Sequence, residues 1–152
     1  MKEIIIKLNK VVGLIISEGK LGKVVLFAMI TRSDLEGKWD ILISTDGLEK
    51  NNSEKDLMYV IEQLKKEFIN DLSSISQIVL FLPTEDIIKD FARALTEIDY
   101  KEGEIISSLK LKEGVTIGEM CVIKGDFSNL DLKPIDKVVK EETITTDKVD
   151  EF

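Results

Sequence analysis

The apolar residues of this chain recur at two spacings, one typical of helices and the other of strands. Intervals of three and four residues occur in segments 3–17, 57–68 and 87–98. The clearest such stripe is Leu57, Val60, Ile61, Leu64 and Phe68. Ser53 and Asp56 stand at its start with the spacing of a capping box. We therefore predict helices in these three segments.

The first of these segments has an alternative interpretation. Residues 3–17 are rich in β-branched side chains and contain Gly13, and both features lower helix propensity. The apolar spacing favours a helix, while two strands joined at residues 8–10 remain the alternative. Gly19 follows the segment and is the expected C-terminal cap of the helix.

Two pairs of segments have the pattern of antiparallel hairpins. Residues 24–31 and 39–45 are strand-like and are joined by a polar turn. Residues 104–111 and 115–124 form the second pair, around the sequence Lys-Glu-Gly.

A further strand is predicted between the second and third helices, at residues 77–82 (QIVLFL). Its apolar run shows no alternation, which is typical of a strand covered on both faces. We therefore expect residues 78–82 to form an interior strand, flanked on both edges. Pro83 ends this strand, and Thr84 is the expected N-cap of the next helix.

The elements follow in the order α-β-β-α-β-α-β-β. This order predicts an α/β protein, bordering on α+β, with three helices and a mixed sheet of about five strands in one domain at residues 1–125. The expected core residues are Val25, Phe27, Ile41, Ile43, Leu64, Phe68, Val79, Phe81, Phe91 and Leu95.

Residues 126–152 have a different composition, with eight acidic residues against four lysines. We expect an acidic tail that is loosely attached or partly packed, and dispensable for folding beyond about Ser128.

The overall charge and residue content exclude several classes of function. The net charge of −8 and the presence of only two arginines oppose nucleic-acid binding. Since no apolar run approaches the ~20 residues of a membrane span, we expect a cytoplasmic protein. The absence of histidine removes Ser-His-Asp and Cys-His catalysis. The single cysteine, Cys121, is expected to be a buried hydrophobic residue, and no cofactor is predicted.

The sequence GKWDILISTDG at residues 37–47 contains the only tryptophan, between two aspartates. Strand alternation directs Trp39, Ile41, Ile43 and Thr45 to a core face. It directs Asp40, Leu42 and Ser44 to the other face, which we expect to meet solvent or a shallow pocket. The favoured interpretation is structural, a strand with a turn at each end.

Three carboxylates could meet where two parallel strands end. If the second and third strands are parallel, Asp46 and the pair Glu85 and Asp86 approach one edge of the sheet. These residues, with Asp40 as a further candidate, could hold Mg²⁺ or Mn²⁺ in a hydrolase or phosphotransferase. A simpler interpretation is that Glu85 and Asp86 stabilise a helix N-terminus.

The favoured function is non-catalytic and acts through protein–protein contacts. Ile6 and Leu14 lie outside the main apolar face of the first segment, and such excess apolar surface favours a partner, often a second copy of the chain. The alternatives are the metal-assisted enzyme and a small-ligand-binding regulator.

Overall fold

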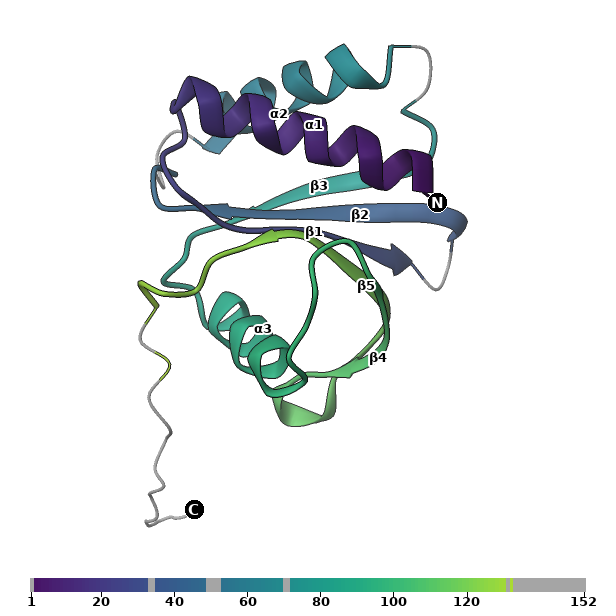
Figure 1. Ribbon diagram of the computed structural model, residues 1–152, viewed down its shortest axis with the longest axis vertical. Helices are drawn as coiled ribbons and strands as arrows, with labels where there is room; N and C mark the ends of the chain where they lie inside the picture. The colour runs from purple at the N-terminus through teal and green to yellow at the C-terminus, as the bar shows by residue number, and fades with distance from the viewer. Residues whose placement is uncertain (1, 33–34, 49–52, 70–71, 131, 133–152) are drawn as a thin grey trace.

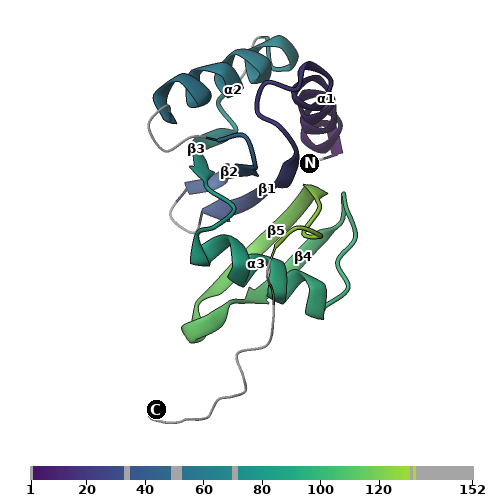
Figure 2. The same ribbon diagram turned by 90° about the vertical axis from the view of Figure 1, so that its left-hand side faces the viewer.

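The protein folds as a mixed five-stranded sheet with helices on both faces (Figures 1 and 2). The computed structural model describes residues 2–32, 35–48, 53–69, 72–130 and 132. The helices are α1 (Lys2–Glu18), α2 (Ser53–Glu67) and α3 (Asp86–Glu97), with a 3₁₀ turn η2 (Lys112–Gly114). The strands are β1 (Val24–Arg32), β2 (Leu35–Thr45), β3 (Ile75–Phe81), β4 (Ile105–Lys110) and β5 (Thr116–Gly125). The predicted fold class and element order are confirmed.

The strands lie in the order β3-β2-β1-β5-β4. The hairpins β1–β2 and β4–β5 are antiparallel, as predicted, and β1 also pairs antiparallel with β5. β2 and β3 are parallel, because α2 connects them as a crossover. The three interior strands are thus β2, β1 and β5.

The predicted interior position of β3 is wrong, because β3 is an edge strand. Its apolar run instead reflects cover on both faces: Ile78 and Leu80 pack under α1 and α2, and Val79 and Phe81 pack with α3. Cover on both faces and pairing on both edges are independent, and only the first makes a strand continuously apolar.

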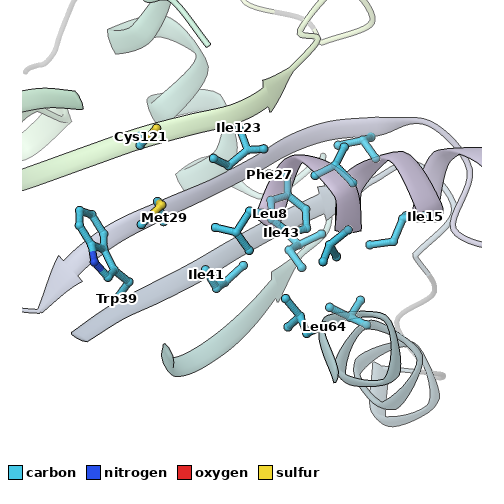
Figure 3. Close-up of a cluster of buried hydrophobic side chains, with 14 of the residues drawn as sticks. Leu8, Ile15, Phe27, Met29, Trp39, Ile41, Ile43, Leu64, Cys121 and Ile123 are labelled. Atoms are coloured by element: carbon cyan, nitrogen blue, oxygen red, sulfur yellow. The ribbon is translucent and has the colours of Figure 1, made fainter. Parts of the chain in front are cut away.

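Helices α1 and α2 lie together over one face of the sheet, here called the α1/α2 face (Figure 1). The fully buried side chains of this layer include Leu8, Ile15, Phe27, Ile41 and Leu64, which converge between the helices and the strands (Figure 3). Trp39 and Cys121 belong to the same cluster, so the predicted core face of β2 and the predicted burial of Cys121 are confirmed.

Helix α3 covers the opposite face, here called the α3 face (Figure 2). Its buried residues Ile88, Phe91 and Leu95 pack against strand residues that include Leu42. The second face of β2 is therefore buried: Asp40 is 7% exposed and Ser44 is 0% exposed. The expectation of solvent or a shallow pocket there is wrong, because α3 arrives from a distant part of the chain.

The N-terminal segment is a helix, which decides between the two interpretations of residues 3–17. Its apolar stripe is buried at Leu8, Val11, Val12 and Ile15, whereas Gly13 is exposed. Gly19 has φ +68 and donates its N–H to Ile15 O, as expected of a C-terminal glycine cap.

Two contacts join α1 to α2 and to Phe68, the residue that follows α2. The Lys7 ammonium lies 5.2 Å from the centre of the Phe68 ring. The Tyr59 hydroxyl donates a hydrogen bond to Glu18 Oε1. Desolvation, and then this bond, raise the pKa of Tyr59 to about 12.

Eight of the ten predicted core residues are buried, and the other two, Val79 and Phe81, are partly buried on the edge strand. The start of the predicted tail is also packed. Phe127 and Leu130 contact the α3-face core, and Lys23 Nζ lies 3.1 Å from Asp126 Oδ2. Residues 131 and 133–152 lie outside the described residues, so their predicted dispensability is untested.

Among the described residues, no helix combines the length and apolar character that a membrane crossing requires.

Candidate functional site

The first candidate site lies at the carboxyl ends of the parallel strands β2 and β3. A pocket of about 490 Å³ lies there, between the first residues of α2 and the entry to α3. Its lining residues are Leu48, Ser53, Asp56, Leu80, Phe81, Leu82, Thr84 and Glu85. This volume falls within the range of small-molecule pockets. The small-ligand alternative therefore stays a prediction, and of the three proposed metal ligands only Glu85 lines the pocket.

Asp46 follows β2, and its carboxylate fixes the connection between α1 and β1. Its Oδ1 accepts the N–H of Lys23 at 2.7 Å. Next to it, Gly47 donates its N–H to Leu21 O at 2.8 Å. The Asp46 carboxylate thus satisfies a backbone donor of a neighbouring loop, as a turn residue does.

Glu85 and Asp86 stand at the N-terminus of α3. Glu85 occupies the N-cap position, so the predicted cap at Thr84 is one residue too early. The Glu85 Oε2 atom accepts the N–H of Leu82 at 2.6 Å, which closes the turn between β3 and α3. Asp86 is the first helical residue, and its negative charge is favourable at the positive end of the helix dipole.

The metal-site interpretation receives no support from this geometry. Two of its carboxylates, those of Asp46 and Glu85, accept backbone N–H groups of two different loops. Asp40 is buried on the second face of β2, and its Oδ2 accepts a hydrogen bond from Gln77 Nε2 at 2.9 Å. Within the described part of the chain, no three acidic or cysteine side chains gather as metal ligands would. The Mg²⁺ or Mn²⁺ site stays a prediction that one substitution can test.

We expect Asp86→Asn to lower the free energy of unfolding by about 0.3–1 kcal/mol, because it removes a negative charge from a helix N-terminus. A cluster of metal-binding carboxylates predicts the opposite sign without metal, because neutralising one of them relieves repulsion. Urea denaturation with a chelator, repeated with Mg²⁺ or Mn²⁺, measures both effects. Stabilisation of the metal-free protein, together with loss of a metal-induced gain, would establish the metal site.

The second candidate site is the free edge of β3. One side of this strand pairs with β2, and among the described residues no strand pairs with the alternate backbone N–H and C=O groups on its other side. The sequence of β3, ISQIVLF, contains no charge and no proline, the residues that usually protect an edge strand. Its one irregularity is a register shift near Ser76, and residues 77–81 pair regularly with β2.

An apolar groove of about 280 Å³ runs beside this edge, between α2 and β3. Its lining residues are Leu57, Ile61, Leu64, Leu72, Ile75, Ser76, Gln77 and Ile78. Two exposed apolar side chains are close to it in sequence, Met58 at 53% exposure and Ile69 at 79%. The edge therefore combines strand-pairing capacity with a surface that holds apolar side chains.

The opposite edge of the sheet shows the contrast. In β4, Ser108 has a positive φ of 62, although the register of the pairing with β5 is the same on both sides of it. β4 also ends at an exposed lysine, Lys110. A lysine is one of the devices that prevent edge-to-edge pairing. β3 has no charge of this kind.

Sequence reasoning placed the candidate partner surface on α1. Ile6 is indeed 54% exposed, but Leu14 is partly buried. The groove at α2 and β3 was missed, because the apolar run of β3 was interpreted as an interior strand. The signal that could have revealed it is the apolar side chain of Met58, which lies outside the buried stripe of α2.

The buried thiol of Cys121 offers no chemistry at neutral pH. Burial raises its pKa, and this effect outweighs an opposing backbone hydrogen bond at Gly103. A thiol is nucleophilic only as the thiolate, which a raised pKa makes scarce.

Comparisons with protein-family models, with curated proteins and with solved structures find no significant match to this chain.

Proposed function

We propose that this protein is a non-catalytic interaction module that binds a protein partner through the free edge of β3 and the apolar groove beside it. The observation that carries the proposal is the groove between α2 and β3, which lies along an edge strand without charge or proline. A strand added to a sheet edge gains main-chain hydrogen bonds, and adjacent pockets select alternate side chains. The β3 edge offers both components.

The chemistry of the chain supports a binding function over a catalytic one. Histidine is absent, the only thiol is buried, and the carboxylates of Asp46 and Glu85 hold loop N–H groups. In contrast, the groove walls are formed largely by leucine and isoleucine. Such walls bind apolar side chains and exclude water from neighbouring main-chain hydrogen bonds.

A selection from a random peptide display library tests the proposal with the full chain. We expect the bound peptides to carry apolar residues at alternate positions, since a strand directs every second side chain into the groove. Ile61→Lys places a charge in the groove wall and should weaken their binding about tenfold or more. The matched control, Ile6→Lys, makes the same change at an exposed position on α1 and should leave binding unchanged.

The result that would overturn the proposal is equally specific. The proposal is wrong if the chain neither binds peptides nor self-associates in a manner that Ile61→Lys weakens and Ile6→Lys leaves unchanged. Circular dichroism of both variants establishes that each one is folded before binding is compared.

A further inference from the structure

We infer that the partner at the β3 edge is a second copy of this chain. In this arrangement β3 pairs antiparallel with its copy across a two-fold axis, and α2 packs against α2. The inference rests on the proposed function and narrows it to self-association. It follows from the self-complementary sequences of both elements.

The strand is compatible with pairing to itself. A two-fold axis places each β3 residue opposite a residue of the same strand, so any charge in the strand would meet a like charge nearby. β3 carries none. Residues opposite one another in an antiparallel pair share a sheet face, so Ile78 and Leu80 would meet their copies on the α1/α2 face. That face is where the apolar groove lies.

The sequence of α2 is symmetric along the stripe that this arrangement brings together. Glu54, Met58, Ile61 and Lys65 follow at intervals of four, three and four residues, which places them on one side of a helix. Ile61 of this stripe lines the groove at β3. In an antiparallel helix pair centred between residues 59 and 60, Met58 faces Ile61 of the second copy. Glu54 then faces Lys65 of the second copy, and both contacts occur twice.

Charge complementarity thus favours a second copy over an unrelated extended peptide. The stripe reads acidic, apolar, apolar, basic, and its own reverse matches it at every position. The strand pair alone would bury little surface, since stable dimers bury about 1,200–2,000 Å² in total. Contact between the two α2 helices supplies the additional area, and it covers Met58, which is 53% exposed in the single chain.

Light scattering after size-exclusion chromatography tests the inference with the full chain. We expect a species of twice the 17.2 kDa chain mass, which dissociates on dilution between about 100 and about 1 µM. Met58→Lys should raise the dimer dissociation constant about 100-fold, because each dimer contains two such contacts. Ile6→Lys, at a side chain of matched exposure on α1, should leave the constant unchanged.

Charge reversal tests the register of the two helices. Glu54→Lys places like charges opposite each other twice and should weaken the dimer about tenfold, and Lys65→Glu should do the same. The double variant restores both pairs with their signs exchanged, so its dissociation constant should return close to that of the unmodified chain. This register is contradicted if both single variants raise the dimer dissociation constant and the double variant does not lower it again.

The outcomes separate this inference from the function on which it rests. A monomer at about 100 µM that still binds peptides in an Ile61-dependent manner would overturn self-pairing and leave the interaction module intact. A monomer without such binding would overturn both. A dimer that is insensitive to both Met58→Lys and the charge reversals would place self-association on another surface.

Discussion

Replacing Leu64 with alanine will lower the free energy of unfolding by about 2–5 kcal/mol. Leu64 is fully buried in the layer between α2 and the sheet, next to Ile41 and Ile43 in the same cluster (Figure 3). Truncation removes apolar contacts and leaves a cavity that the rigid strands can fill only in part.

Urea denaturation at one fixed protein concentration measures this loss. The matched control is Glu62→Ala, on the exposed side of the same helix, which should change stability by less than about 0.5 kcal/mol. A loss for Leu64→Ala as small as that of the control would mean that α2 does not pack on the sheet as described.

The periodicity of the sequence predicted which elements form but not all of their neighbours. Helical spacing identified α2 and α3, and alternation placed Trp39, Ile41 and Ile43 on one core face. These patterns are local, because they depend on which faces of an element are covered. The position of β3 at the sheet edge depends on pairing between distant segments, which an apolar run does not encode.

The burial of polar side chains on β2 could not be predicted from the local sequence pattern either. Asp40 and Ser44 alternate with core residues, which is the usual sign of an exposed strand face. They are buried because α3, more than forty positions away in the sequence, closes over that face. Asp40 keeps a polar contact there through Gln77, a residue of the neighbouring strand.

The metal site predicted from three carboxylates stays a prediction, although the strand arrangement on which it was based is observed. The sequence placed Asp46, Glu85 and Asp86 near the carboxyl ends of a parallel strand pair, and β2 and β3 are indeed parallel. It could not show that the Asp46 carboxylate binds the N–H of Lys23, because that contact depends on the exact path of two loops. Likewise, the symmetric stripe of α2 can be identified in the sequence, but it indicates a dimer contact only because the structure places α2 beside the edge strand β3.

The second large expected effect on stability is at Gly47, where the loop after β2 contacts the loop between α1 and β1. The Gly47 N–H donates to Leu21 O, and the two backbones approach closely there. A methyl group at Gly47 would overlap with Leu21 O and would lie 3.0 Å from Gly22 N. All of these atoms belong to backbone, which cannot rotate away as a side chain does. Gly22 itself has a φ of +75, which L side chains rarely adopt, so this loop has little freedom to adjust.

We therefore expect Gly47→Ala to lower the free energy of unfolding by about 1–3 kcal/mol, the usual effect of overpacking. Gly13→Ala is the matched control: among the described atoms nothing lies within 4 Å of an added methyl group, and alanine should stabilise the exposed interior of α1 by about 0.5–1 kcal/mol. Urea denaturation of both variants should thus give opposite signs for the same chemical change. If Gly47→Ala were as stable as the unmodified protein, the loops would not approach as closely as described. The Asp46 carboxylate would then be free to leave Lys23, and its assignment as a turn residue would lose its structural basis.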